Sequence, residues 1–220
     1  MGYQHQWHDG QAIDWPLGKV VCVGRNYADH AAELNNPIPD QPLLFIKPAT
    51  AAVALTSPLH LPTGRGSVHY ETELAVLIGK PLHHAGESEA REAIAGIGLA
   101  LDLTLRDLQS ELKAKGHPWE RAKAFDGACP LSAFIPLKPE DDVDKLFFSL
   151  SIDGQIRQQG HTGNMITPVL ALIAHISETF SLLPGDVVLT GTPAGVGELQ
   201  SGQRLELELE DRLHVETGVE

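Results

Sequence analysis

The segment at residues 67–78 alternates between two kinds of side chain, and this pattern constrains the fold more than any other part of the chain. A period of two residues is typical of a β-strand whose successive side chains point to opposite faces. Glu71 and Glu73 therefore share one face. The same face continues through Ala75 and Leu77, which predicts that it is buried. Because unpaired carboxylates are costly to bury, this strand needs positive charge nearby.

A third carboxylate, Asp102, follows in a second strand-like run at residues 97–104. Three converging carboxylates can be balanced by a divalent cation, and a ligand set made only of oxygen favours Mg²⁺ or Mn²⁺ over Zn²⁺. We therefore predict that Glu71, Glu73 and Asp102 bind such an ion. The alternative for the glutamate pair is a solvated strand face.

Short apolar segments dominate the rest of the chain. Strand patterns occur at residues 19–23, 43–47, 147–152, 187–190 and 205–209, the last with the look of an edge strand, and Asp153-Gly154 predicts a hairpin turn. Helical patterns occur at residues 25–34, 106–113 and 169–180, and in a segment that Ser88 would cap. Many strands, few helices and no regular βαβ order predict a mainly β, mixed α+β fold. We expect one domain at residues 19–220, after a loosely packed N-terminal lead at residues 1–18.

Composition excludes several classes of partner. Acidic residues outnumber basic residues by 29 to 16, and the net charge of −13 disfavours nucleic acid or an anionic membrane surface. Cys22 and Cys129 are too few for a disulfide framework and lack the spacing of metal ligands. The sequence predicts neither a signal peptide nor a membrane span, so we expect a cytoplasmic protein. Residues 195–197 complete no nucleotide-binding fingerprint, and no serine or cysteine lies in a nucleophile elbow.

His30 and Glu33 lie three residues apart on one face of a predicted helix. A glutamate that orients a histidine makes a general base able to take a proton from water. The proline-rich loop that follows could close over a site and exclude solvent. The alternative for the pair is a surface ion pair.

Other candidate residues lie near the ends of predicted strands. Arg106 and Gln109 could hold a substrate carboxylate, unless they form an exposed helix face. Lys123, between aromatic residues, could stabilise an enolate. Thr192 offers a hydroxyl within a glycine-rich segment, although a tight turn would explain the same sequence.

Several motifs run in order through residues 19–210: Val23-Gly24-Arg25-Asn26-Tyr27, Phe45-Ile46-Lys47-Pro48, His69-Tyr70-Glu71-Thr72-Glu73-Leu74, Asp102-Leu103-Thr104 and Thr190-Gly191-Thr192-Pro193-Ala194-Gly195-Val196-Gly197. In these motifs the chain resembles the fumarylacetoacetate hydrolase family. The resemblance implies a mixed β-roll around a β-sandwich-like core and a homodimer. It also implies roles for the candidate residues: Mg²⁺ or Mn²⁺ ligands Glu71, Glu73 and Asp102, a water-activating pair His30 and Glu33 on a mobile lid, Lys123 near metal and substrate, and substrate contacts from Arg25, Arg106, Gln109 and Thr192.

The short chain resembles the branch of the family that acts on acylpyruvates and oxaloacetate. We therefore predict a Mg²⁺- or Mn²⁺-dependent hydrolase that cleaves the C–C bond of a 2,4-dioxo acid, of acylpyruvate or fumarylpyruvate type, to pyruvate and a carboxylic acid. The alternative is an oxaloacetate tautomerase or decarboxylase that uses the same site. A third hypothesis is a non-enzymatic, metal-stabilised binding protein.

Overall fold

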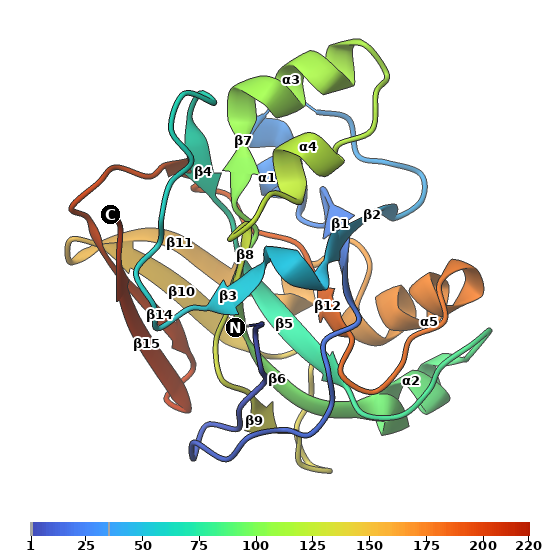
Figure 1. The fold of residues 1–220 in the computed structure, drawn as a ribbon. Coiled ribbons are helices and arrows are strands. Elements are labelled where there is room, and N and C mark those ends of the chain that lie inside the picture. Colours follow the sequence, from blue (N-terminus) through green and yellow to red (C-terminus); the bar gives the residue numbers. More distant parts are fainter. Residues whose placement is uncertain (1, 35) are drawn as a thin grey trace.

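The computed structural model describes residues 2–34 and 36–220 and shows a mixed α+β fold built mostly of strands (Figure 1). The strands are Lys19–Gly24 (β1), Leu43–Pro48 (β2), Ala52–Ala54 (β3), Val68–Tyr70 (β4), Thr72–Ile78 (β5), Ile94–Leu101 (β6), Thr104–Leu105 (β7), Cys129–Leu131 (β8), Ile135–Pro136 (β9), Phe147–Ile152 (β10), Gln155–His161 (β11), Val187–Leu189 (β12), Gly197–Glu198 (β13), Arg204–Leu209 (β14) and Leu213–Gly218 (β15). The helices are Ala28–Glu33 (α1), Glu87–Ala93 (α2), Arg106–Ala114 (α3), Glu120–Lys123 (α4) and Val169–Thr179 (α5), with 3₁₀ turns at Ala49–Ala51 (η1) and Thr162–Asn164 (η2). The predicted fold class is confirmed.

The largest sheet has the strand order β2-β1-β12-β5-β6-β8-β3, and β9 also pairs with β6. Strand β5 lies near its middle, antiparallel to both β12 and β6. Every residue of β5 is buried, because the sheet is covered on both faces. Ala75 and Leu77 are fully buried, as predicted for the face that carries the glutamates.

A second sheet, β11-β10-β14-β15, packs against one face of the large sheet (Figure 1). Leu74 and Val76 of β5 belong to the same apolar cluster as Leu150 of β10 and Leu207 of β14. The layered pair of sheets agrees with the sandwich-like core that the family resemblance implies. Strand β14 lies inside its sheet between β10 and β15, so the prediction of an edge strand there was wrong.

The N-terminal residues cover the opposite face of the large sheet. Ile13 is buried in a cluster with Leu77 and Phe134. His8 N–H donates to the Phe134 carbonyl at 2.8 Å, and Phe134 N–H donates to the Gln6 carbonyl at 2.8 Å. The prediction of loose packing was therefore wrong for the described residues 2–18, because their apolar side chains complete a core that the sheet alone leaves uncovered.

The alternation at residues 67–78 predicted one strand, and this prediction was wrong. The run is divided at Glu71 into β4, in a small sheet of order β13-β4-β7, and β5, in the large sheet. The second run divides in the same way, so Asp102 lies between β6 and β7 and not within a strand. Asp102 N–H donates to the Glu71 carbonyl at 2.8 Å, which joins the two breaks. Both segments bend from one sheet into another at this corner, and the bend brings their carboxylates together.

The other elements agree with the sequence patterns within a few residues. Asp153 and Gly154 both have positive φ, +52° and +73°, as the predicted hairpin turn requires. Helix α2 begins after Gly86 and not after Ser88, because Glu89 accepts the Gly86 N–H at 2.9 Å and closes the first turn there. Among residues 2–34 and 36–220 no helix is both long enough and apolar enough to cross a membrane.

Candidate active site

Glu71, Glu73 and Asp102 converge at the corner between the sheets. Each offers one carboxylate oxygen, and these oxygens all lie within 4.8 Å of one another. The three side chains are buried, with exposed fractions of 5%, 1% and 1%. The solvated strand face considered for the glutamate pair is therefore excluded. Burial of this much negative charge requires compensation from the surrounding elements.

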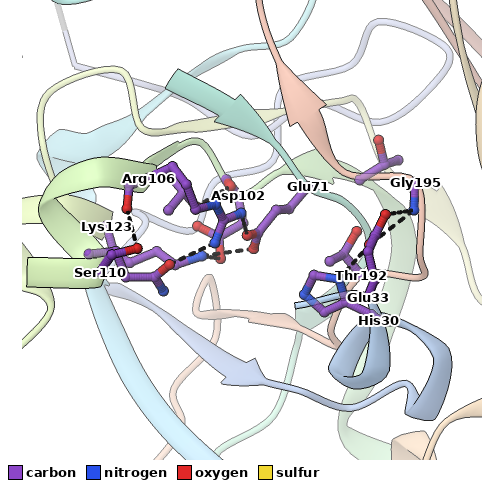
Figure 2. A network of polar contacts seen from close by, with 12 residues as sticks. His30, Glu33, Glu71, Asp102, Arg106, Ser110, Lys123, Thr192 and Gly195 are labelled. Atoms are coloured by element: carbon purple, nitrogen blue, oxygen red, sulfur yellow. Dashed lines mark hydrogen bonds and ion pairs between the residues drawn. The ribbon is translucent and has the colours of Figure 1, made fainter. Parts of the chain in front are cut away.

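Cationic side chains pair with two of the three carboxylates (Figure 2). Lys123, the last residue of α4, donates to Glu71 Oε2 at 2.8 Å and to Asp102 Oδ2 at 2.6 Å. Arg106, the first residue of α3, pairs with Glu71 Oε1. Although burial would raise the pKa of Glu71, Lys123 and Arg106 hold it below its usual range. Donors from two helices thus hold the Glu71 and Asp102 carboxylates in place.

Glu73 is held differently. Its Oε2 accepts the Gly191 N–H at 2.6 Å, and no ion pair to it occurs among the described residues. Gly191 has φ +97°, and a Cβ on it would lie 2.7 Å from Asn26 Cβ, so this donor position suits glycine alone. Burial first, and then the charges of Asp102 and Glu71, raise the pKa of Glu73 well above its usual range. A bound cation would offset the burial and the charge repulsion that disfavour ionised Glu73.

The donor set fits a hard divalent ion. Mg²⁺ and Mn²⁺ prefer carboxylate oxygens, and the three oxygens already lie close enough together to share one ion. No cysteine or histidine belongs to this cluster, which argues against zinc. We conclude that Glu71, Glu73 and Asp102 would hold Mg²⁺ or Mn²⁺ here.

His30 and Glu33 of α1 face this group across the site, with Thr192 beside them (Figure 2). His30 is 5% exposed whereas Glu33 is exposed, so the pair joins a buried imidazole ring to a carboxylate at the surface. His30 Nδ1 lies 3.4 Å from Glu33 Oε2, and the Glu33 carboxylate also accepts the Gly195 N–H at 3.1 Å. Glu33 thereby connects the imidazole ring to the glycine-rich segment. Nε2 of His30 has no partner among the hydrogen bonds of residues 2–34 and 36–220.

The predicted substrate-contacting residues line the same pocket as the carboxylates and His30. They are Arg25, Arg106, Gln109 and Thr192. Gln109 Oε1 accepts from Arg106 Nη1 at 2.7 Å, so the helix face that they form is engaged and not exposed. Arg25 adopts φ +61°, a conformation that costs energy for a residue with a Cβ and that is typical of functional segments. All four residues thus line one pocket with the carboxylates, and their contacts with a substrate stay a prediction.

Sequence reasoning missed three residues of this region. Lys47 on β2 is fully buried, and its Nζ lies 2.7 Å from Asp102 Oδ1, so it neutralises the carboxylate from the side opposite to Lys123. A lysine inside the apolar run of β2 was the available signal. Lys113 lines the pocket. Gln158 of β11 donates to Thr192, which also lines the pocket. No local pattern in the sequence marks these last two.

The family comparison agrees with this geometry. The signature described as fumarylacetoacetate (FAA) hydrolase C-terminal matches residues 19–220. The chain belongs to the fumarylacetoacetate hydrolase family. Among its relatives is oxaloacetate tautomerase YcgM of Escherichia coli, 55% identical over 92% of this chain and 93% of the relative. A mitochondrial oxaloacetate decarboxylase of Dictyostelium discoideum is 44% identical over 86% of this chain and 88% of the relative.

Solved structures of the family share the fold. A Yersinia pestis protein assigned to the fumarylacetoacetate hydrolase family superposes with a TM-score of 0.97 at 51% identity, covering 99% of this chain and all of that one. The fumarylpyruvate hydrolase of Pseudomonas aeruginosa, in complex with Mn²⁺ and pyruvate, superposes with a TM-score of 0.92 at 35% identity, covering 99% and 95%. Family and relatives support an enzyme, and the buried carboxylates could bind a metal ion.

Proposed function

We propose that this protein is a Mg²⁺- or Mn²⁺-dependent oxaloacetate tautomerase, which converts the enol form of oxaloacetate to the keto form. The observation that carries the proposal is the identity of 55% to an oxaloacetate tautomerase over nearly the whole of both chains. The sequence motifs favoured C–C bond hydrolysis, with oxaloacetate tautomerisation as the alternative. The fumarylpyruvate hydrolase of Pseudomonas aeruginosa is more distant, at 35% identity, so the tautomerase is the better supported of the two.

The reaction moves a proton from the enol oxygen at C2 to carbon C3, and no bond between heavy atoms breaks. A divalent ion held by the three carboxylates would supply a Lewis acid that lowers the free energy of the enolate. His30 would deliver or remove the proton at C3, and the proposal is supported by a ring that faces the carboxylate group and contacts Glu33. Lys123 adds a buried positive charge beside the same group.

The charges around the pocket support a dicarboxylate substrate. Arg25, Arg106 and Lys113 line it in addition to Lys123. Burial first, and then the charges of Arg25 and Arg106, lower the pKa of Lys113, which shows how closely these cations crowd. An anion with a carboxylate at each end relieves that repulsion better than an acylpyruvate with one carboxylate.

A comparison of substrates tests the proposal. The Mg²⁺-loaded wild-type protein should convert enol-oxaloacetate with a kcat/KM at least about 100-fold above that for the cleavage of acetylpyruvate. Ultraviolet absorbance follows the loss of the enol, and a coupled lactate dehydrogenase assay follows pyruvate. Cleavage of acetylpyruvate that is faster than enol conversion would restore the hydrolase reading.

Decarboxylation is a second candidate, because the relative from Dictyostelium discoideum carries that name at 44% identity. Both reactions would use the same enolate, and they differ in whether the C3–C4 bond breaks. Pyruvate released from oxaloacetate at the rate of enol loss would identify the protein as the decarboxylase.

Lys113 should recognise the carboxylate farthest from the metal ligands. Substitution Lys113→Met should raise the KM for oxaloacetate about 10-fold, because a hydrogen bond to a charged group is lost. Inhibition by 2-oxobutanoate, which has a methyl group in place of that carboxylate, should not change. The matched control is Lys115→Met, which alters a lysine with a 55% exposed side chain that pairs with Glu111. An equal loss of affinity for both ligands would show that Lys113 instead acts through Asn36, to which it donates at 2.7 Å.

A further inference from the structure

Gln158 is a buried amide in an otherwise exposed stretch of strand β11. Its neighbours Arg157 and Gln159 are exposed, whereas Gln158 is only 1% exposed and points toward the large sheet. Burial of a primary amide is unfavourable unless its donors and acceptor are satisfied. The partners that satisfy Gln158 belong to the two segments that build the candidate active site.

The hydrogen bonds of Gln158 determine which way its amide points. Its Oε1 accepts the Thr72 N–H at 2.9 Å, and its Nε2 donates to the Pro193 carbonyl at 2.9 Å. A backbone N–H can only donate and a carbonyl can only accept, so the reversed amide would lose both bonds. The second hydrogen of Nε2 is then directed to Thr192 Oγ1, at 2.8 Å.

This arrangement determines the role of the Thr192 hydroxyl. Because Thr192 Oγ1 accepts from Gln158, its own hydrogen must point elsewhere. No acceptor for that hydrogen occurs among the hydrogen bonds of residues 2–34 and 36–220. Thr192 is 3% exposed and lines the pocket that also contains His30 and the carboxylates. The hydroxyl hydrogen is therefore available to an oxygen atom bound in the pocket.

The same amide also links the two walls of the site. Thr72 lies between Glu71 and Glu73, so the Thr72 N–H belongs to the segment that carries two of the carboxylates. Thr192 and Pro193 lie in the segment that begins with Gly191, whose N–H holds Glu73. Gln158 reaches both from a different sheet and bridges residues far apart in the sequence.

We infer that Gln158 is a positioning residue, which holds the Thr192 hydroxyl as an acceptor toward itself and hence as a donor toward an oxygen of a 2-oxo acid. The inference rests on the proposed function only for the identity of the substrate. Oxalate, which resembles the carboxylate and 2-oxo oxygens of such acids, is the suitable probe. It is not turned over, so its affinity is independent of the reaction that the enzyme catalyses.

A double-mutant cycle tests this inference on the Mg²⁺-loaded protein. Thr192→Val should weaken oxalate binding about 10-fold in titration calorimetry, since one hydrogen bond to a charged ligand is lost. Gln158→Met should weaken it by a similar factor, and the double variant should be no weaker than either single variant. Thr192→Ser should retain wild-type affinity. Gln159→Met, on the exposed side of the same strand, should have no effect.

A second substitution guards against loss of the fold. Gln158→Glu has the same shape and retains an acceptor for the Thr72 N–H, but it attracts the Thr192 hydroxyl hydrogen away from the pocket, so it should also weaken oxalate binding. Thermal unfolding shows which variants are folded. Independent, multiplying effects of the two substitutions, or wild-type oxalate affinity in a folded Gln158 variant, would overturn the inference. Normal coupling in a protein that does not convert enol-oxaloacetate would refute the proposed function alone.

Discussion

Replacement of Glu73 by glutamine should lower enol-oxaloacetate turnover at least about 100-fold and should stabilise the metal-free protein. The two effects have one cause. Glu73 is the buried carboxylate without an ion-pair partner among the described residues, so it provides charge for the metal at the expense of the apoprotein. Glutamine has the same shape and can still accept the Gly191 N–H, but it does not bring a negative charge beside Asp102 and Glu71.

The pH dependence of stability gives this prediction a sign. The folded pKa of Glu73 is raised, so the folded apoprotein retains a proton that the unfolded chain releases at lower pH. Binding of this proton stabilises the folded apoprotein. The stabilisation is fully present below the pKa of Glu73 in the unfolded chain and is lost as the pH rises through its pKa in the folded protein. The advantage of Glu73→Gln in thermal unfolding, measured with a chelator present, should therefore increase as the pH rises over that range.

The matched control is Glu208→Gln on β14, where the glutamate side chain is 58% exposed. It should change neither turnover nor stability. If Glu73→Gln retains wild-type Mn²⁺ affinity in a titration, Glu73 is not a metal ligand and the assignment of the carboxylate site fails.

Replacement of His30 by alanine should lower kcat for enol-oxaloacetate about 100- to 10,000-fold, the usual contribution of a general acid or base. KM should change little, because the carboxylates and the cationic residues that bind substrate are retained. Glu33→Gln should cause a smaller loss, since the ring remains but its orientation is less fixed. Stopped-flow measurement of the enol absorbance gives both constants.

Helix α5 provides the control for this substitution. His175 and Glu178 have the same spacing as His30 and Glu33, and their nearest side-chain atoms are 3.6 Å apart, but the pair lies on the surface away from the carboxylates. His175→Ala should leave kcat unchanged. Wild-type turnover of every 2-oxo acid by His30→Ala would remove His30 from the mechanism.

The meeting of Glu71, Glu73 and Asp102 could be predicted from sequence, although part of the reason was wrong. Alternation in the two runs correctly indicated strands, burial and convergence. It could not show that the two runs change sheet at Glu71 and Asp102. The bend depends on the small sheet, in which β4 pairs with β13 and β7, and both partners are distant from β4 in the sequence. Local patterns specify strands, and pairing partners decide where a strand ends.

Residues that act through long-range contacts were beyond sequence reasoning. Gln158 contacts Thr72, 86 positions earlier, and Thr192, 34 positions later, and nothing in the exposed sequence around it marks it as buried. A partner for Lys47 could have been predicted, since a charged residue in a buried strand requires one. The identity of that partner, Asp102, depends on how β2 lies relative to the corner.

The most direct measurement of the central claim is a proton NMR time course of enol-oxaloacetate in D₂O with the Mg²⁺-loaded wild-type protein. The proposed mechanism predicts that keto-oxaloacetate deuterated at C3 accumulates as the enol disappears, while pyruvate forms no faster than in the absence of protein. Pyruvate that appears in step with the loss of enol would contradict it, because a C–C bond would then break in each turnover.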